Sequence, residues 1–222
     1  MLRDLLLIIV VGLTSASCGV NDAQEFELGE RAEQAGNHAE AYWHWRALAE
    51  RGHAGAQYRI GWMYANAHGL VLDEPEAMQW WRQAAEQGHA DASFALAMAY
   101  YRGEGVKRDP RSAVHWLTKS LRLGVEDAGP MLLSMAGKGV ERAENLVRQQ
   151  LRGERWRDWG GVRRVKADRA NLRAGPGTDH ELVAKLPKGS ELLVLHDEDG
   201  WVRVGIPGSG ELAWIYGPLL EP

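Results

Sequence analysis

The segment WWRQAAEQGHADA, residues 80–92, places two tryptophans, two adjacent alanines and a glycine–histidine pair within one short stretch. Its pattern returns when the chain is compared with itself at a shift of 36 residues, which aligns AMQWWRQAAEQGH (77–89) with AVHWLTKSLRLGV (113–125). The same shift aligns AGAQYRIGWMY (54–64) with ADASFALAMAY (90–100). Self-similarity at a fixed period of this length is typical of helical repeat proteins. The segment is therefore part of a tandem array.

Each unit of the array predicts two amphipathic helices. Apolar and small residues in the second helix of the middle unit recur at helical spacing, at Ala77, Trp81, Ala84, Ala85 and Gly88. Trp45, Trp81 and Leu117 share one repeat position, which we expect to be buried between helices. Small residues at Gly61 and Ala97 would let neighbouring helices approach closely, and the large side chains would then fill the remaining gap.

The ends of the helices are also marked. Asp73 and Asp109 predict N-caps, and Pro110 suits the first helical position. Gly88 and Gly124 predict the left-handed residue at which a helix ends. Residues 26–53 form a shortened first unit, in which Gly29 aligns with Gly61, and residues 126–152 form a degenerate closing unit.

The segment ALAMAYYRGEGVKRDPRSAVHWL (95–117) resembles the Sel1-like repeat, a relative of the tetratricopeptide repeat, in its GEGV loop and in Asp109, Ala113 and Trp116. The resemblance implies an α-helical solenoid over residues 26–152 whose concave face binds a protein partner. The large residues outside the apolar stripes are candidates for that face: Tyr58, Trp62, Tyr101 and Trp80.

After residue 153 the pattern changes to short β-type runs between turns. Strands are expected near residues 162–167, 181–186, 191–196, 201–206 and 212–216. The motifs NLRAGPG (171–177) and DGWVRV (199–204) resemble a bacterial SH3-like domain, although Ala213 stands where that family usually has glycine. The fold class is thus multidomain α + β: a solenoid of 36-residue helix-turn-helix units, a linker at 153–161, and a small antiparallel SH3-like β-barrel at 162–222.

One face of the expected barrel carries candidate binding residues. In WVRVGI (201–206) the aliphatic residues alternate with outward positions, so an exposed strip is expected from Trp201, Arg203, Trp214 and Tyr216. Rigid aromatic rings beside an arginine suit contact with a peptide or a sugar. The SH3-like resemblance implies peptidoglycan or a peptide as the ligand. The alternative is that the tryptophans close the end of the barrel and expose only their edges.

The N-terminal residues predict export. An apolar core from Leu5 to Leu13 and a run of small residues precede Cys18, the only cysteine. This arrangement resembles a bacterial lipoprotein signal, which implies a signal peptide at 1–17, acylation of Cys18 and a tether at 18–25. An ordinary cleaved signal and an uncleaved anchor stay open as alternatives. We expect a lipid-anchored protein of the cell envelope, at the outer membrane and facing the periplasm or the surface.

The sequence predicts no catalytic, cofactor-binding or metal-ligating set. It has no GxSxG, HExxH or GxxxxGK motif, and its only cysteine lies at the expected processing site. The net charge of −4 gives no overall attraction to nucleic acid. We therefore expect a non-catalytic adaptor. The alternatives are an accessory or regulator of a cell-wall hydrolase, and a surface-displayed protein that interacts with a host.

Overall fold

The computed structural model describes residues 22–221, so the expected signal peptide and Cys18 lie outside the described residues. The chain forms two compact units, of which the first ends at Arg108 and the second begins at Asp109. Within the described part of the chain, every helix is too short or too polar to cross a membrane.

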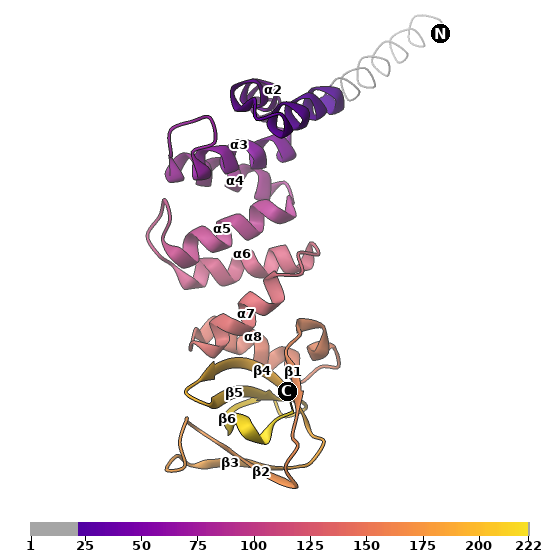
Figure 1. The fold of residues 1–222 in the computed structure, drawn as a ribbon, viewed down its shortest axis with the longest axis vertical. Coiled ribbons are helices and arrows are strands. Elements are labelled where there is room, and N and C mark those ends of the chain that lie inside the picture. Colours follow the sequence, from indigo (N-terminus) through magenta and orange to yellow (C-terminus); the bar gives the residue numbers. More distant parts are fainter. Residues whose placement is uncertain (1–21, 222) are drawn as a thin grey trace, which may run out of the picture. The chain divides into compact units, whose positions relative to one another are not determined.

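The first unit is built from consecutive helices that pack side by side (Figure 1). A helix runs through residues 22–34 and is followed by α2 (His38–Glu50), α3 (Ala54–Asn66), α4 (Glu74–Glu86) and α5 (Ala90–Arg102). Their apolar stripes form a core that contains Ala41, Trp45, Leu48, Ala56, Ile60, Met63 and Trp80. The expected two-helix repeat is confirmed in this unit.

Trp81 shows how one helix of a repeat is held against the other. A Cβ atom at Gly61 would lie 2.6 Å from Cδ1 of Trp81, so the indole lies directly on the glycine backbone of α3. The Trp81 Nε1 donates to the carbonyl of Tyr58 at 3.3 Å. Trp81, expected to be buried, is only half-buried, whereas its neighbour Trp80, one of the large residues outside the expected apolar stripes, is 7% exposed. Trp80 packs in the apolar core of this unit, and its Nε1 donates to the carboxylate of Glu76 at 2.9 Å.

The same arrangement recurs one repeat earlier. Trp45 lies against the backbone of Gly29, where a Cβ atom would overlap the indole. Its Nε1 donates to the carbonyl of Phe26 at 3.3 Å. The ring of Phe26 stacks on His53 at a centroid distance of 5.1 Å. The alignment of the shortened first unit through Gly29 and Gly61 is therefore confirmed by equivalent contacts.

The predicted helix ends are confirmed. A carboxylate oxygen of Asp73 accepts from the amide of Glu76 at 2.9 Å, and one of Asp109 accepts from the amide of Arg111 at 3.0 Å. Gly88 follows α4 at a φ of +90°, and Gly124 follows α6 (Pro110–Arg122) at +94°, which a side chain would disfavour. These local signals set the repeat boundaries.

The second unit continues from α6 with α7 (Ala128–Gly137), α8 (Glu141–Leu151) and the 3₁₀ helix η1 (Arg155–Trp159). The barrel follows as β1 (Val162–Arg164), β2 (Arg169–Arg173), β3 (Leu182–Pro187), β4 (Glu191–Glu198), β5 (Trp201–Ile206), β6 (Glu211–Tyr216) and the 3₁₀ helix η2 (Gly217–Leu219). The strands form one antiparallel sheet in the order β1-β4-β5-β6-β2-β3.

The structure contains a strand, β2, that the sequence did not predict. Its residues 169–173 read RANLR, with few of the β-branched and aromatic residues that mark a strand. The alternation is nevertheless present, because Ala170 and Leu172 are fully buried and the residues between them face outward. The strand was missed because it is only five residues long and is followed by a glycine-rich turn.

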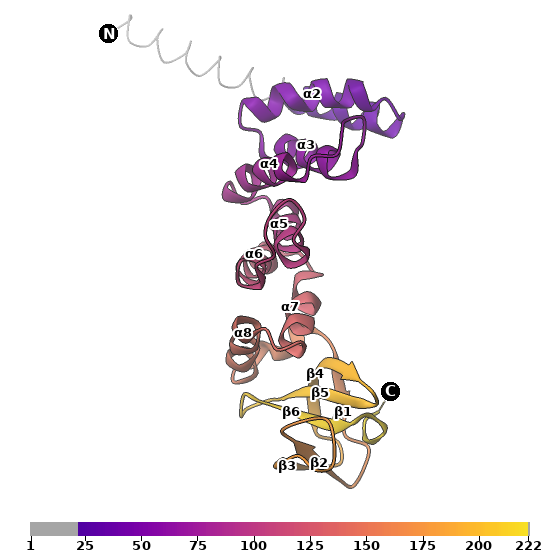
Figure 2. The same cartoon turned by 90° about the vertical axis from the view of Figure 1, so that its left-hand side faces the viewer.

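Helices α7 and α8 pack against β4 and β5, while β2 and β3 lie on the side of the barrel away from these helices (Figure 2). Two glycines allow this packing. A Cβ at Gly205 would lie 2.5 Å from Cδ1 of Leu151, and one at Gly137 would lie 2.5 Å from Cβ of His196. The segment expected as a linker forms η1, in which Trp156 is 4% exposed. The barrel and the last helix pair therefore share one compact unit.

Candidate functional site

The barrel carries a groove of about 650 Å³ on the side formed by β2, β5 and β6. Its walls combine two aromatic rings with two arginines and several polar groups. The residues that line it are Arg169, Asn171, Arg173, Gly177, Thr178, Asp179, Trp201, Tyr216 and Leu219.

Trp201 and Tyr216 form the aromatic wall of this groove. They are directly opposite each other on β5 and β6, with ring centroids 5.7 Å apart at an interplanar angle of 56°. Their neighbours Val202 and Ile215 are fully buried, so strand alternation directs both rings away from the core. Tyr216 is 47% exposed. Trp201 and Tyr216 thus form an accessible aromatic pair, as expected for these two residues of the predicted strip.

Strand β2 supplies the basic wall. Because Ala170 and Leu172 are buried, Arg169, Asn171 and Arg173 share the outward face. The guanidinium of Arg173 donates to the carbonyl of His180 at 2.7 Å, which connects the strand to the loop that carries Asp179. The groove thus offers guanidinium donors beside aromatic rings, an arrangement suited to a ligand with carboxylates and flat or sugar-like faces.

Arg203 differs from the expectation, since it does not face the groove. Its guanidinium donates to the carbonyls of Ala136 and Gly137 at 2.8 and 3.0 Å and to a carboxylate oxygen of Glu144 at 2.7 Å. Its side chain is only 17% exposed. The alternation of β5 does place Arg203 outside the barrel core, but α7 and α8 cover that position.

Trp214 lies between these two environments. It pairs with Arg203 on β5 and with Arg173 on β2, and the Arg203 guanidinium carbon is 6.0 Å from the centre of its ring. It is half-buried and does not line the groove. The structure therefore combines Trp201 and Tyr216 with β2 residues that sequence reasoning missed, and the alternation in RANLR was the signal that could have identified them.

A second concavity, of about 640 Å³, lies within the first unit. Its lining combines apolar side chains from α3, α4 and α5 with charged residues: Trp62, Trp81, Phe94, Met98, Glu74, Arg102 and Glu104. Of the expected repeat-face residues, Trp62 lines it, whereas Tyr58 stacks on His89 at 4.8 Å and Tyr101 contacts Arg108. Of the residues proposed from the sequence for the binding face of the repeats, Trp62 is therefore the one that lines this concavity.

Among residues 22–221, one group of histidines and carboxylates is compact enough to share a metal ion: Glu33, His38 and His68. Burial raises the pKa of Glu33, but hydrogen bonds with His38 and His68 outweigh this effect and hold its pKa below the usual value. Sequence reasoning missed this cluster because its members lie in three separate segments and match no ligand-spacing motif.

Comparison with known families assigns both parts of the chain. Residues 54–89 and 90–125 match the Sel1 repeat, and residues 168–221 match the bacterial SH3 domain. Both are typically binding modules without catalytic activity. The resemblance inferred from the sequence motifs is therefore confirmed.

Individual relatives agree with this assignment. The crystal structure of a Sel1 repeat protein from Oxalobacter formigenes is 25% identical, with a TM-score of 0.50 over 56% of this chain and 54% of that one. The structure of c5321, a protective antigen of uropathogenic Escherichia coli, is 30% identical with a TM-score of 0.55 over 62% of this chain and 31% of that one. Bacillus subtilis (strain 168) YrvJ, named as a candidate N-acetylmuramoyl-L-alanine amidase, is 32% identical over 56 residues, which are 25% of this chain and 11% of that protein.

Proposed function

Because the chain combines Sel1 repeats with a bacterial SH3 domain, we propose that it is a non-catalytic adaptor of the bacterial cell envelope. In this proposal the repeats bind a protein partner, and the barrel groove binds peptidoglycan or a peptide. Export through the segment before Cys18 and acylation of Cys18 would attach the adaptor to a membrane, at the outer membrane in our proposal.

The observation that carries the proposal is the pairing of Trp201 with Tyr216 beside Arg169 and Arg173. Peptidoglycan presents sugar rings and short peptides that carry carboxylates. Aromatic rings stack on sugars and peptide planes, and a guanidinium binds a carboxylate through paired hydrogen bonds. Asp179 at the same groove offers an acceptor for an amine of the peptide. The groove therefore presents partners for the sugar rings, carboxylates and amines of such a ligand.

The first unit offers the protein-binding surface. Its concavity is lined by the apolar side chains of Trp62, Phe94 and Met98 and by the ion pair of Arg102 with Glu104, which are 3.6 Å apart. An apolar centre with a polar rim is the usual composition of a protein interface. We propose that a partner segment binds there, with Trp62 as the anchoring side chain. The expected contribution of Tyr58 and Tyr101 stays a prediction.

Retention on isolated cell wall tests the barrel half of the proposal. The purified protein should sediment with peptidoglycan, and Trp201→Ala should reduce the retained fraction about tenfold or more, as loss of an anchoring aromatic does at an interface. Trp43→Ala is the matched control, because Trp43 is 70% exposed and lies in the repeats. Equal retention of the wild type and Trp201→Ala would refute the assignment of this groove.

The anchor is tested separately. Cells that express the wild type should incorporate labelled fatty acid into the protein and retain it in the membrane fraction. Cys18→Ser should abolish the label and release the protein. Labelling of both forms, or of neither, would contradict acylation at Cys18.

A second candidate function is an accessory or regulator of a wall hydrolase, which the match to the B. subtilis amidase favours. The adaptor proposal expects no soluble fragments when the purified protein is incubated with cell wall. Release of fragments by the protein alone would show hydrolysis, while faster release by an added amidase would show regulation.

A surface-displayed protein that interacts with a host is another alternative, and the similarity to a protective antigen present in uropathogenic E. coli strains is compatible with it. Digestion by protease on intact cells would indicate surface exposure, and protection would indicate a periplasmic location.

A further inference from the structure

Three ionisable side chains from three separate segments converge at the start of the repeats. Glu33 lies near the end of the helix that covers residues 22–34, His38 is the first residue of α2, and His68 follows α3. One carboxylate oxygen of Glu33 is 2.9 Å from Nδ1 of His38, and the other is 3.1 Å from Nδ1 of His68. One ligand atom from each of the three residues lies within 4.8 Å of the other two.

The surrounding residues position this cluster closely. The two imidazole rings lie 4.6 Å apart between their centroids, and Trp62 packs edge-on against His68, also at 4.6 Å. Gly69 has a φ of +71°, and a Cβ there would lie 2.6 Å from Cβ of His38. The loop after α3 can therefore approach α2 because residue 69 has no side chain.

From this geometry we propose that Glu33, His38 and His68 bind one divalent transition-metal ion, with Zn²⁺ as the ion of choice. Ligands of a tetrahedral site with bonds of about 2.0–2.1 Å lie about 3.3 Å apart. The observed separations of 2.9 and 3.1 Å between the carboxylate oxygens and the two Nδ1 atoms are already close to that value. Small shifts of the side chains would place an ion between them.

The donor set determines the class of metal. Two imidazole nitrogens and one carboxylate oxygen suit Zn²⁺ and its neighbours in the first transition row, whereas Ca²⁺ and Mg²⁺ prefer oxygen ligands throughout. Each Nδ1 donates a hydrogen bond to the Glu33 carboxylate in this structure, so binding of an ion through Nδ1 would replace these hydrogen bonds and require each ring to carry its proton on Nε2. The side chains of His38 and His68 are 35% and 41% exposed, so an ion can enter from solvent and keep water as its fourth ligand.

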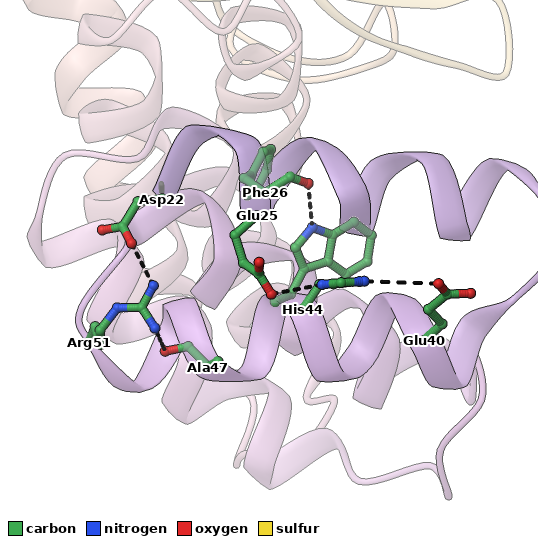
Figure 3. A network of polar contacts seen from close by, with 8 residues as sticks. Asp22, Glu25, Phe26, Glu40, His44, Ala47 and Arg51 are labelled. Carbon is green, nitrogen blue, oxygen red and sulfur yellow. Dashed lines mark hydrogen bonds and ion pairs between the residues drawn. The ribbon is translucent and has the colours of Figure 1, made fainter. Parts of the chain in front are cut away.

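Glu25 and His44 provide an internal comparison. His44 Nδ1 lies 2.7 Å from Glu25, and its Nε2 lies 4.0 Å from Glu40 (Figure 3). This group also joins a histidine of α2 to the preceding helix, but it lacks the second imidazole. It is therefore the matched site at which an ion should not bind.

Calorimetric titration of the metal-stripped full chain with Zn²⁺ tests the proposal. We expect one Zn²⁺ per chain, and His68→Gln or His38→Gln should weaken the affinity more than about 100-fold, since loss of an outer-shell partner alone costs about 10- to 100-fold. His44→Gln should leave the affinity unchanged. Co²⁺ should give the intense visible absorption of a four- or five-coordinate ion, and His68→Gln should remove that absorption.

Circular dichroism of each variant verifies its fold. If a histidine variant does not fold, Glu33→Gln replaces it as the test variant, because it preserves the size of the side chain. The proposal is overturned if the wild type binds no more Zn²⁺ than the His38→Gln/His68→Gln double variant. It is also overturned if His44→Gln weakens binding as much as His68→Gln does. Retention on cell wall has a separate readout, so either proposal can fail without the other.

Discussion

The guanidinium of Arg203 on β5 donates to the carboxylate of Glu144 on α8 at 2.7 Å, with side-chain exposures of 17% and 18%. The same guanidinium donates to the carbonyls of Ala136 and Gly137 at the end of α7. Arg203→Ala should lower the free energy of unfolding by about 3 kcal/mol, because it removes the nearest cation from a shielded carboxylate and a hydrogen-bond donor from the end of α7. Urea denaturation followed by circular dichroism measures this loss.

The control for this prediction is an exposed ion pair of the same unit. Arg155 lies 2.9 Å from Asp158, and its side chain is 85% exposed. Arg155→Ala should cost less than about 1 kcal/mol, as is usual for surface pairs. Equal effects of Arg203→Ala and Arg155→Ala would mean that Arg203 does not hold the helices on the barrel.

A side chain at position 61 should destabilise the repeats, because the indole of Trp81 packs directly on Gly61. Replacing glycine by alanine inside a helix normally stabilises it by about 0.5–1 kcal/mol. Gly61→Ala should instead lower the free energy of unfolding by about 1–3 kcal/mol, because the new methyl group overlaps the indole. The next repeat has Ala97 and Leu117 at the equivalent sequence positions. Thermal unfolding should therefore show that Trp81→Leu partly restores the stability lost in Gly61→Ala. If the double variant loses as much stability as the two single variants together, the packing argument is contradicted.

His89 should make the repeats less stable in mild acid. Its Nδ1 accepts the amide hydrogen of Ala92 at 3.3 Å, which a protonated ring cannot do. Burial lowers the pKa of His89 below its usual 6.5, and the charge of Arg59 adds to this while Asp91 opposes it. The unfolded chain therefore binds the proton more readily, so the stability that His89 contributes is complete above about pH 6.5 and is lost as the pH falls through the folded pKa.

His89→Asn isolates this effect, since asparagine is a good N-cap that does not titrate in this range. The wild type should lose more free energy of unfolding than His89→Asn between about pH 7.5 and pH 5. Urea midpoints at the two pH values measure the difference. Parallel pH profiles of the two proteins would show that His89 does not titrate on unfolding.

Local signals in the sequence predicted the repeats well. Asp73, Asp109 and Gly88 act through their nearest neighbours, so their roles can be inferred from spacing alone. The match between Trp81 and Gly61 was also accessible, because the repeat placed a large residue opposite a small one. Features that depend on a few adjacent residues can thus be predicted without coordinates.

The binding groove could be predicted only in part. Alternation placed Trp201 and Arg203 on the same outward face of β5, but it carries no information about which helix covers that face. The covering contacts of Arg203 come from residues 136, 137 and 144, far away in the chain. The cluster of Glu33, His38 and His68 was missed for the same reason, since its geometry depends on tertiary packing.

The groove of the barrel should show two separable contributions to wall binding. Trp201→Ala should weaken binding by about 2 kcal/mol, or about 30-fold, at every salt concentration, because stacking is not screened. Arg169→Gln should weaken binding less at high salt than at low salt, because Arg169 is exposed and its attraction to carboxylates is screened. Arg155→Gln, which removes a charge outside the groove, should have no effect at either concentration. Sedimentation with purified peptidoglycan at low and high salt measures all three, and a salt-independent loss in Arg169→Gln would exclude an ionic contact at this position.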